Sequence, residues 1–438
     1  MINNIFYFIF CYYVEYVTMN KIIMRKREMK MKVCVVGLGY IGLPTAMSLA
    51  SAGVQTVGVD KNIEIIKSLN EGKMTFKEDG MDELFRKARE SGNLNISEKC
   101  VGAEVYIIAV PTPYLKISKQ IEPKYVLGAV KDVLEVAPKG AIMAIESTIS
   151  PGTIDRFVRP LIAETGRILG KDIHIAHVPE RIIPGNMLYE LEHNSRTIGA
   201  DDISVAEKLK EIYGSFCKGN IIFTDIKTAE MAKVVENTYR DINIAFANEL
   251  AKMCNRADMD VYEIIKVANM HPRVNILTPG PGVGGHCISV DPWFLVGDYP
   301  DIVNIIRQAR IINDEMPEYV LKRISEIMKE NGIRDLSEVG FYGLTYKEDV
   351  DDTRESPTLQ LIECMEKHLA FGARFYDPMV DKTIVENQYH DFDQFLDGLK
   401  LVVVMVGHSH LKDNIDKIND LIVYDTRHCV ETEHLYRL

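Results

Sequence analysis

The feature that most constrains the fold is a glycine-rich turn between a short apolar run and a helical pattern. Residues 32–36 are mostly apolar, three glycines follow at Gly37, Gly39 and Gly42, and residues 41–52 have the composition of a buried helix. A strand, a tight turn and a helix in this order begin a βαβ unit. Because βαβ units place strands in parallel, the chain is expected to build a parallel sheet covered by helices.

Strand and helix patterns alternate along much of the remaining chain. Residues 55–59, 105–110, 141–146 and 173–177 predict further strands, so residues 31–205 predict a doubly wound Rossmann domain. Strand patterns return at residues 338–343, 374–376, 400–406 and 421–424, with a helix expected at 356–369. Residues 326–438 therefore predict a second, smaller Rossmann-like domain.

The segment between these two regions has a different character. Residues 228–253 contain no Gly or Pro and are rich in Ala, Glu, Lys and Met, which predicts one long central helix. Further helices are expected at 260–267 and 301–316, and a loop rich in Gly and Pro at 272–291. Residues 206–325 thus predict a helical middle domain, and the fold class is α/β with two Rossmann-like domains joined by it.

Residues 1–30 stand apart from this organisation. An aromatic and apolar stretch at 5–17 is interrupted by Glu15 and is followed, not preceded, by basic residues. A signal peptide has the opposite order, and a membrane helix needs about 20 apolar residues. Since Met29 or Met31 lies directly before the first strand, we interpret residues 1–30 as an N-terminal extension that is either not native or loosely ordered.

Composition limits the possible partners. The 438 residues carry a net charge of −12, which argues against a nucleic acid held by phosphate contacts. The eight cysteines show no CxxC or metal-finger spacing, so buried reduced thiols in a cytoplasmic protein, with no metal site and no stable membrane insertion, are expected.

The glycine turn has the G-x-G-x-x-G spacing of a dinucleotide site, with Tyr40 and Ile41 inside it. Gly37 allows the tight turn, Gly39 lets the backbone approach a pyrophosphate, and Gly42 allows close packing of helix on strand. The second strand ends at Asp60, 18 residues after Gly42. A carboxylate there binds a ribose diol and repels a 2′-phosphate, which favours NAD over NADP. A Rossmann relic without ligand, or an FAD or other nucleotide site, are the alternatives.

Two further strand ends carry threonines that are candidate cofactor contacts. Thr112 follows the strand expected at 105–110, and Thr148 follows that at 141–146. Ligands of such sheets bind outside the carboxyl ends of the strands. Taken singly, each threonine fits a turn or helix cap equally well.

A candidate chemical site follows the glycine- and proline-rich loop. Cys287 comes directly after Gly284, Gly285 and His286, and Asp291 lies four residues later. His286 and nearby cations are expected to lower the pKa of the thiol, and one helical turn would bring Asp291 to the same face. A thiolate and a carboxylate beside NAD suit aldehyde oxidation through a thiohemiacetal and a thioester.

Polar residues recur on the long helix at Lys233, Asn237 and Arg240, whose spacing places them on one face. Lysine and asparagine together can donate to a developing oxyanion. Spacing alone, however, favours a solvated helix face.

Other polar residues are candidates for substrate and proton chemistry. Glu180, after the strand at 173–177, is a possible general base, and Arg181 a possible anion binder. Arg273, at the start of the glycine loop, suits a phosphate or sugar hydroxyls. Lys347 ends a strand-to-helix connection that could meet a nucleotide, whereas residues 351–356 also fit an ordinary helix start.

In this order, the motifs resemble the UDP-glucose/GDP-mannose dehydrogenase family from residue 31 to about 430. The resemblance implies NAD-dependent four-electron oxidation of a nucleotide sugar's C6 alcohol to a carboxylate. It implies that Cys287 is the nucleophile, that Lys233 and Asn237 stabilise the oxyanion, that Asp291 positions water or assists proton transfer, and that Glu180 acts in thioester hydrolysis.

The same resemblance implies a homodimer or higher homo-oligomer formed through the middle domain, with Arg354 contacting the cofactor of the other subunit. Lys347 is then a substrate ligand. The full set of residues expected at the substrate is Arg181, Lys233, Asn237, Arg240, His271, Arg273, Gly284, Tyr346 and Lys347.

The loop from His271 to Phe294 and the segment 179–185 resemble the branch of the family that acts on UDP-N-acetyl-D-mannosamine. Enzymes acting on UDP-glucose typically read G-F-G-G-S-C-F-x-K-D at the cysteine. Enzymes acting on UDP-N-acetyl-D-glucosamine are close relatives, so the configuration at C2 stays open. Ser289 departs from the proline or alanine frequent in the branch, and little effect is expected.

Two readings from other classes stay open. Two-electron β-hydroxyacid-type dehydrogenases share the first domain and a helix with Lys-x-x-x-Asn, but lack the Gly-Gly-His-Cys loop and the C-terminal α/β domain. A non-catalytic nucleotide-sugar sensor would bind without forming NADH, and the intact set of Cys287, Lys233 and Asn237 argues against it.

Overall fold

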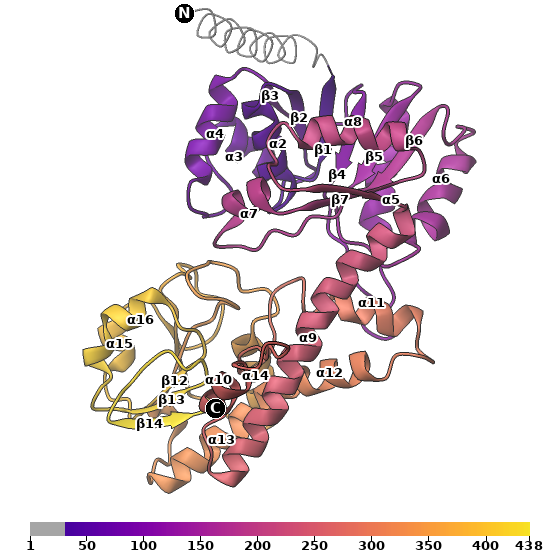
Figure 1. Ribbon diagram of the computed structural model, residues 1–438. Coiled ribbons are helices and arrows are strands. Elements are labelled where there is room, and N and C mark those ends of the chain that lie inside the picture. Colours follow the sequence, from indigo (N-terminus) through magenta and orange to yellow (C-terminus); the bar gives the residue numbers. More distant parts are fainter. Residues whose placement is uncertain (1–30) are drawn as a thin grey trace, which may run out of the picture. The chain divides into compact units, whose positions relative to one another are not determined.

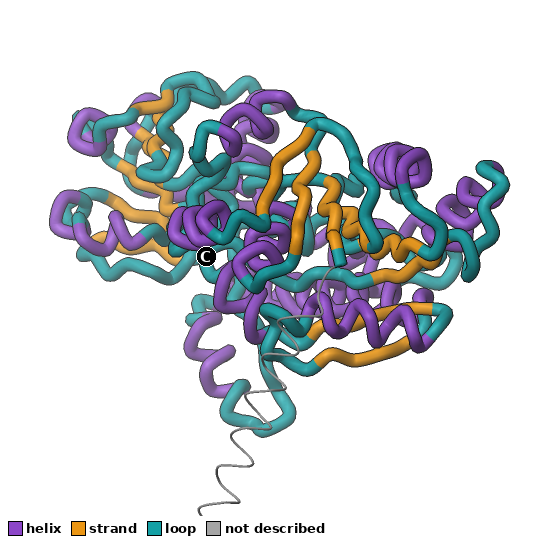
Figure 2. Tube along the Cα trace, turned by 90° about the horizontal axis from the view of Figure 1, so that it is seen from above, coloured by secondary structure: helices purple, strands orange, loops and turns teal. Residues whose placement is uncertain are grey.

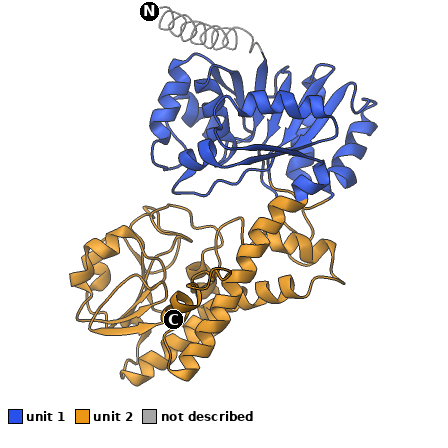
Figure 3. Cartoon of the chain, in the orientation of Figure 1, with its two compact units in different colours: residues 1–112, 123–147, 152–230 blue, residues 113–122, 148–151, 231–438 orange. Residues whose placement is uncertain are grey.

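The computed structural model describes residues 31–438, which divide into two compact units (Figures 1 and 3). Unit 1 holds the described residues up to Thr112, together with 123–147 and 152–230. Unit 2 holds residues 113–122, 148–151 and 231–438. The expected N-terminal extension, residues 1–30, lies outside the described residues.

Unit 1 is built on an eight-stranded sheet in the order β3-β2-β1-β4-β5-β6-β7-β8. Neighbouring strands are parallel, except for the antiparallel pair β6 and β7. The strands are β1 (Lys32–Val36), β2 (Gln55–Val59), β3 (Leu94–Ser97), β4 (Val105–Ile108), β5 (Ala141–Ile145), β6 (Ile173–His177), β7 (Arg196–Ala200) and β8 (Ile221–Thr224).

Helices connect most of these strands (Figure 2). Helix α2 packs against β1 and β2, α5 against β4, and α8 against β6, β7 and β8. The helices are α2 (Gly42–Ser51), α3 (Ile63–Asn70), α4 (Met81–Glu90), α5 (Lys124–Val136), the π-helical turn Ile154–Val158, α6 (Arg159–Glu164), α7 (Met187–His193) and α8 (Ile203–Tyr213).

The central strands of unit 1 are buried along their whole length. In β4 and β5 every residue is buried, and in β1 all but Lys32 are. Parallel strands covered on both faces read as continuous apolar runs rather than alternating ones. This is why the sequence marks these strands clearly.

Unit 2 contains a six-stranded, wholly parallel sheet in the order β11-β10-β9-β12-β13-β14. Its strands are β9 (Val339–Tyr342), β10 (Arg374–Tyr376), β11 (Gln388–Tyr389), β12 (Leu401–Val404), β13 (Ile422–Asp425) and β14 (His434–Arg437). Its helices are α10 (Val261–Ala268), α11 (Asp291–Asp298), α12 (Ile305–Asp314), α13 (Met316–Glu330), α14 (Pro357–Lys367), α15 (Phe392–Leu396) and α16 (Ser409–Asp413), with 3-10 turns at Leu336–Glu338 and Ile415–Lys417.

Helix α9 (Ile226–Ala257) is the predicted long helix and spans 32 residues. Ala247 and Ala251 of α9 share one hydrophobic core with Val320 of α13 and with Phe341 and Val403 of the second sheet. The helical segment after residue 231 and the second sheet are therefore packed together within unit 2.

The predicted fold class is confirmed, and β1, β2, β6 and β10 have the predicted bounds. The helix expected at 301–316 is present as the shorter α12, and a break separates it from α13, which begins at Met316. Pro317 explains the break, since proline is tolerated in the first turn of a helix but not in its interior. Within residues 31–438 no helix has the length and apolar character needed to cross a bilayer.

Candidate active site

Each glycine of the glycine turn in unit 1 occupies a different steric environment. Gly37 has φ +96°, and a Cβ there would lie 2.2 Å from the Ala109 carbonyl oxygen. A Cβ on Gly42 would lie 1.9 Å from the Gly37 carbonyl oxygen, whereas a Cβ on Gly39 would have no atom within 4 Å. Gly37 and Gly42 thus serve packing, and Gly39 leaves open space in front of the N-terminus of α2, as a pyrophosphate requires.

Asp60, at the end of β2, is fixed by the backbone around it. Its Oδ2 accepts a hydrogen bond of 2.7 Å from the N–H of Leu38, and its Oδ1 accepts one of 2.8 Å from the N–H of Asn62. Each carboxylate oxygen keeps a second lone pair for a ribose hydroxyl. Asp60 also ties the glycine turn to the end of the second strand.

A cavity of about 940 Å³ opens at this edge of the first sheet, and Gly37, Asp60, Val110, Pro111 and Tyr125 are among the residues that line it. It lies at the carboxyl ends of β1, β2 and β4, where parallel sheets bind nucleotides. Its size and its carboxylate fit the adenosine part of NAD.

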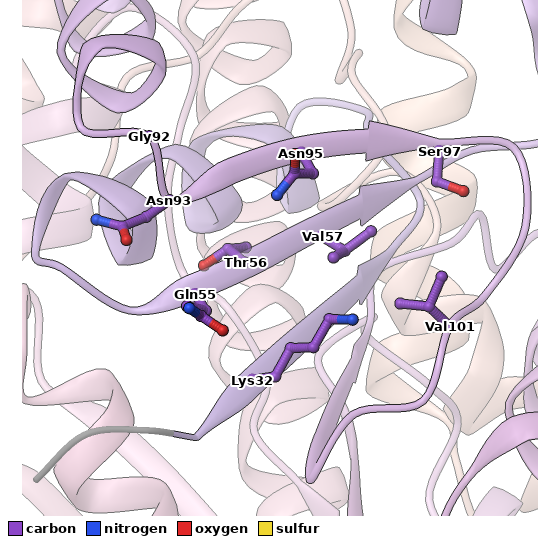
Figure 4. Close-up of a pocket in the computed structure, with 9 residues that line it drawn as sticks. All are labelled: Lys32, Gln55, Thr56, Val57, Gly92, Asn93, Asn95, Ser97 and Val101. Carbon is purple, nitrogen blue, oxygen red and sulfur yellow. The ribbon is translucent and has the colours of Figure 1, made fainter.

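A second cavity of unit 1, of about 370 Å³, lies across the first three strands (Figure 4). Its lining begins at the amino ends of these strands, with Lys32, Gln55 and Asn93. Lys32 is the one charged residue among the described residues that line it. Its position therefore distinguishes this cavity from the larger one at the carboxyl ends of the strands.

The remaining predicted cofactor contacts have varied surroundings. Tyr40 and Ile41, at the start of α2, are half-buried, and the Tyr40 ring packs on Phe76 with 4.5 Å between centroids. Thr112 is half-buried and is not among the described residues that line the larger cavity. Thr148, after β5, is half-buried in unit 2. Contact of these residues with NAD stays a prediction.

Unit 1 also contains a buried ionic triad that the sequence did not indicate. The guanidinium of Arg196, on β7, pairs with Glu146 at 3.0 Å and with Glu180, and all three side chains are buried. Thr45 donates to Glu146 at 3.2 Å, and burial raises the pKa of Glu146 to about 7 against the attraction of Arg196. The sequence pattern around Arg196 predicted no strand and gave no signal of this role.

The two candidates after β6 are both tied to the protein itself. In addition to its ion pair with Arg196, Glu180 accepts a hydrogen bond of 2.7 Å from the N–H of Arg181. Arg181 donates to the Ser195 carbonyl oxygen at 2.7 Å and to Thr197 Oγ1 at 3.0 Å. Both residues thus have defined conformations in unit 1, and their catalytic or substrate roles stay predictions.

The chemical site in unit 2 combines α9 with the start of α11. Lys233 and Asn237 lie one turn apart on α9 and are only 6% and 5% exposed, so the solvated helix face favoured by spacing is wrong for these two residues. Asn237 Nδ2 donates a hydrogen bond of 2.6 Å to Asp291 Oδ2, and the Asp291 N–H donates one of 2.9 Å to the Cys287 carbonyl oxygen. The predicted helical turn from Cys287 to Asp291 is therefore present.

The buried Asp291 has a strongly shifted acidity. Burial raises the pKa of its carboxyl to about 6, although the charge of Lys233 and the hydrogen bond from Asn237 both oppose this. An acid with a pKa near the working pH can both hold and release a proton during a reaction.

The expectation that the pKa of Cys287 is lowered is wrong. Surrounding protein atoms and the charge of Asp291 raise the pKa of the Cys287 thiol, and this outweighs the lowering by Lys233, Arg354 and Arg240. His286 does not supply a positive charge, because burial, and then Arg354, lower the pKa of its imidazole. Cys287 as a residue is nevertheless exposed at the surface of unit 2.

The loop before Cys287 needs its two glycines because Tyr346 packs on them. A Cβ on Gly284 would lie 2.7 Å from the Tyr346 Cβ, and one on Gly285 would lie 2.9 Å from the Tyr346 ring. The Gly285 N–H donates to the Arg354 carbonyl oxygen at 3.0 Å. The segments that carry Tyr346 and Arg354 thus contact the cysteine loop directly.

The other predicted substrate residues of unit 2 differ in their exposure to solvent. Arg240 and Lys347 are half-buried, whereas His271 and Arg273 are exposed. Arg354 pairs with the buried Asp352 through two guanidinium nitrogens at 2.6 and 2.9 Å. Their contacts with substrate or cofactor stay predictions.

The sequence matches three domain models of one family. They are the NAD binding, central and UDP binding domains of the UDP-glucose/GDP-mannose dehydrogenase family, over residues 31–217, 227–315 and 340–432. The chain is 43% identical over 411 residues to a UDP-N-acetyl-D-mannosamine dehydrogenase of Methanococcus maripaludis, with 91% of this chain and 93% of the relative covered.

Solved structures agree over almost the whole chain. A UDP-N-acetyl-mannosamine dehydrogenase from Staphylococcus aureus superimposes with TM-score 0.83 at 40% identity, covering 93% of this chain and 97% of that one. The corresponding enzyme from Pyrococcus horikoshii gives TM-score 0.86 at 37% identity, covering 93% and 98%. The predicted family and the predicted cofactor are confirmed: the chain belongs to the NAD-dependent UDP-glucose/GDP-mannose dehydrogenase family.

Proposed function

We propose that this chain oxidises the C6 hydroxyl of UDP-N-acetyl-D-mannosamine to the carboxylate of UDP-N-acetyl-D-mannosaminuronate and reduces two NAD⁺ in doing so. The observation that carries the proposal is the set of Cys287, Asp291, Asn237 and Lys233 in unit 2. The similarity to relatives named for this substrate supports the choice of sugar.

Gly37, Gly39, Gly42 and Asp60 are the residues that would hold the cofactor, and the open space at Gly39 fits a pyrophosphate. When bound, NAD⁺ supplies the acceptor for a hydride in each of the two oxidations. The remaining chemistry belongs to the side chains of the protein.

In the first oxidation the C6 alcohol loses a hydride and a proton and becomes an aldehyde. A deprotonated Lys233 side chain or a water takes the proton. The Cys287 sulfur then forms a bond to C6 and gives up its proton, and the carbonyl oxygen becomes the hydroxyl of a thiohemiacetal. Loss of the second hydride and the hydroxyl proton leaves a thioester.

Hydrolysis returns the enzyme to its starting form. Water adds to the thioester carbon, the bond from carbon to sulfur breaks, the sulfur regains a proton, and the uronate leaves. Lys233 and Asn237 donate to the negative oxygen that forms at C6 in the covalent steps. Asp291, with a pKa of about 6, takes or gives a proton close to neutral pH, and Glu180 assists hydrolysis as in the family.

The raised pKa of Cys287 fits a nucleophile that is kept as a thiol until substrate is present. A thiol is less easily oxidised than a thiolate. The covalent bond to Cys287 keeps the aldehyde in the site until the second oxidation. The substrate contacts proposed beyond Lys233 and Asn237 are Arg181, Arg240, His271, Arg273, Gly284, Tyr346 and Lys347.

A homodimer formed through α9 is part of the proposal. Val235, Tyr239, Phe246 and Met253 are exposed on α9 at spacings of four and seven residues, which gives one apolar stripe along the helix. A second copy of the same stripe is self-complementary about a two-fold axis. In such a dimer Arg354 contacts the cofactor of the other subunit, and we assign the assembly to the cytoplasm.

The decisive experiment measures NADH formation on a panel of UDP-hexoses and UDP-N-acetylhexosamines and counts NADH per sugar. Two NADH per UDP-N-acetyl-D-mannosamine, with the highest kcat/KM in the panel, is expected. Preference for UDP-N-acetyl-D-glucosamine or UDP-glucose would change the proposed substrate but leave the proposed reaction unchanged. One NADH per sugar would support a two-electron dehydrogenase, and binding without NADH would support a sensor.

A further inference from the structure

We propose that His408 and Asp377 are positioning residues that hold the segment 343–349 of unit 2 in the conformation that binds the uridine diphosphate of the substrate. The inference rests on the proposed function, because it takes Lys347 of this segment as a substrate ligand. It concerns two residues far from Cys287 in the sequence, neither of which touches substrate in the proposal.

The three segments involved leave neighbouring strands at the same edge of the second sheet. Segment 343–349 follows β9, Asp377 follows β10 and His408 follows β12. The sheet order places β9 between β10 and β12, and all three strands are parallel. Ligands of parallel sheets bind at this carboxyl edge, so the segment held there is placed for a ligand.

Asp377 fixes the first half of the segment through its backbone. Its Oδ2 accepts hydrogen bonds from the N–H groups of Leu344 at 2.6 Å and Thr345 at 2.9 Å, and its Oδ1 accepts one from Met379 at 2.7 Å. Burial alone would raise the pKa of Asp377, but the hydrogen bond with His408 and the bonds from these backbone donors outweigh burial and lower the pKa. Asp377 is therefore a carboxylate with both oxygens bonded to the protein itself.

His408 fixes the second half of the segment. The imidazole is fully buried, and its Nδ1 accepts a hydrogen bond of 2.9 Å from the N–H of Asp349. An Nδ1 that accepts carries no proton, so the hydrogen of the neutral ring is on Nε2. Nε2 lies 3.2 Å from Asp377 Oδ2 and 3.3 Å from Thr345 Oγ1, and donates to both.

The hydroxyl of Thr345 completes the network and leads to Lys347. Since Thr345 Oγ1 accepts from His408, its own hydrogen is free to bond the Lys347 carbonyl oxygen, at 2.9 Å. The backbone on both sides of Lys347 is thus tied to one buried imidazole and one buried carboxylate. Holding a binding segment in its bound conformation lowers the entropy lost on binding.

The same segment reaches the cysteine loop through Tyr346, whose ring packs on Gly285. The Tyr346 N–H also donates to the Asp352 carbonyl oxygen at 3.0 Å. A shift of the segment would therefore move contacts of the loop that carries Cys287. Loss of His408 should raise KM strongly and lower kcat to a smaller degree.

The test compares His408→Leu and Thr345→Val with the wild-type chain, using isothermal titration calorimetry with UDP and with NAD separately. His410→Leu is the matched control, because His410 is partly buried two residues away and bonds the Tyr342 hydroxyl instead of segment 343–349. We expect Kd for UDP to rise about ten-fold in His408→Leu, equal to about 1.4 kcal/mol, and less in Thr345→Val. NAD affinity should not change.

His408→Asn provides a rescue, since its amide oxygen can accept from the Asp349 N–H in place of Nδ1. Kd for UDP between those of wild type and His408→Leu is expected. Wild-type UDP affinity in both a folded His408→Leu and Thr345→Val would overturn the inference. If His408→Leu does not fold, the UDP affinity of Thr345→Val alone tests the inference, because valine has nearly the same shape as threonine. Failure of the wild-type chain to bind UDP would instead refute the proposed function.

Discussion

The amide of Asn237 donates a hydrogen bond of 2.6 Å to the carboxylate of Asp291, and both side chains are buried. This bond joins the long helix α9 to the first residue of α11, four residues after Cys287. Burial makes this carboxyl group weakly acidic, and the bond gives it one defined orientation near Cys287.

Replacing Asp291 by Asn should stabilise the protein while lowering its activity. Burial raises the pKa of Asp291 from 3.8 to about 6, so the folded state binds a proton that the unfolded state has lost between these pH values. Stability from this group is therefore present below pH 4 and is lost as pH rises to 6. At pH 8 Asp291→Asn should unfold with roughly 1–3 kcal/mol more free energy than wild type.

Guanidinium unfolding at pH 4, 6 and 8 measures this difference, with the exposed Asp301→Asn as the control. The gain should be small at pH 4 and reach its full value by pH 8. A gain that is the same at all three pH values would mean that ionisation of Asp291 is not its source.

Replacing Cys287 by Ala should reduce uronate formation by about three orders of magnitude or more, because the covalent steps are lost. Cys287→Ser should stall after acylation, since an ester at this position is hydrolysed more slowly. Intact-protein mass spectrometry should then find a lasting sugar adduct. Cys364→Ala, on α14, is the control and should react normally. Near-normal uronate production by Cys287→Ala would contradict the proposed covalent mechanism.

Two glycines of the cofactor turn should respond in opposite ways to a methyl group. A Cβ on Gly42 meets a backbone oxygen at 1.9 Å, so Gly42→Ala should lower the melting temperature of the free protein by several degrees. A Cβ on Gly39 meets nothing, so Gly39→Ala should melt normally but bind NAD about ten-fold more weakly or worse.

Thermal melts with and without NAD separate the two effects, and a melt with UDP is the internal control. The assignment of the cavity beside Gly37 to NAD would be wrong if Gly39→Ala bound NAD as wild type does.

Replacing Arg196 by Met should leave Glu146 and Glu180 buried without a counter-charge. A loss of about 3–5 kcal/mol in unfolding free energy is expected at pH 8. Burial has raised the pKa of Glu146 to about 7, so at pH 5 this carboxyl takes a proton and the loss should be smaller. Urea unfolding at both pH values measures this, and Glu146→Gln, which keeps the pair of Arg196 and Glu180, should cost less. An equal loss at pH 5 and pH 8 would contradict the electrostatic explanation.

Charges on the exposed stripe of α9 should dissociate the proposed homodimer. Tyr239→Asp together with Phe246→Asp introduces two negative charges from each subunit into the proposed self-complementary interface. Sedimentation velocity should show half the mass at micromolar concentration, with unchanged circular dichroism. Ile63→Asp, an equally exposed apolar position on α3, is the control and should not alter the mass. A mass unaffected by the double change would remove α9 as the interface.

The sequence predicted the features that depend on local pattern. Fully buried parallel strands such as β4 and β5 are continuous apolar runs, and the glycine turn has a fixed spacing. Short or edge strands such as β3 and β11 were missed, since half-exposed residues carry little hydrophobic signal. The helix expected at 301–316 is present but shorter, and Pro317 lies in the first turn of the next helix, α13.

For the candidate site, spacing found Cys287 and Asp291 but misjudged their surroundings. Whether a lysine on a helix is solvated depends on what packs against it, and Lys233 is buried, with its charge acting on the sequence-distant Asp291. The pKa of Cys287 was expected to fall because cations were near in sequence, yet burial and Asp291 dominate. The networks of Arg196 and His408 join residues tens of positions apart, which no local pattern records.

The hydrogen bonds of Asp60 have a consequence for changing the cofactor. The carboxylate that we propose for the ribose also accepts hydrogen bonds from the N–H groups of Leu38 and Asn62. Replacing Asp60 to admit NADP also removes the hydrogen bonds that hold the turn in shape, and so should weaken the binding of any dinucleotide. A swap of preference in this chain would need a compensating acceptor for Leu38 as well as a cation for the 2′-phosphate.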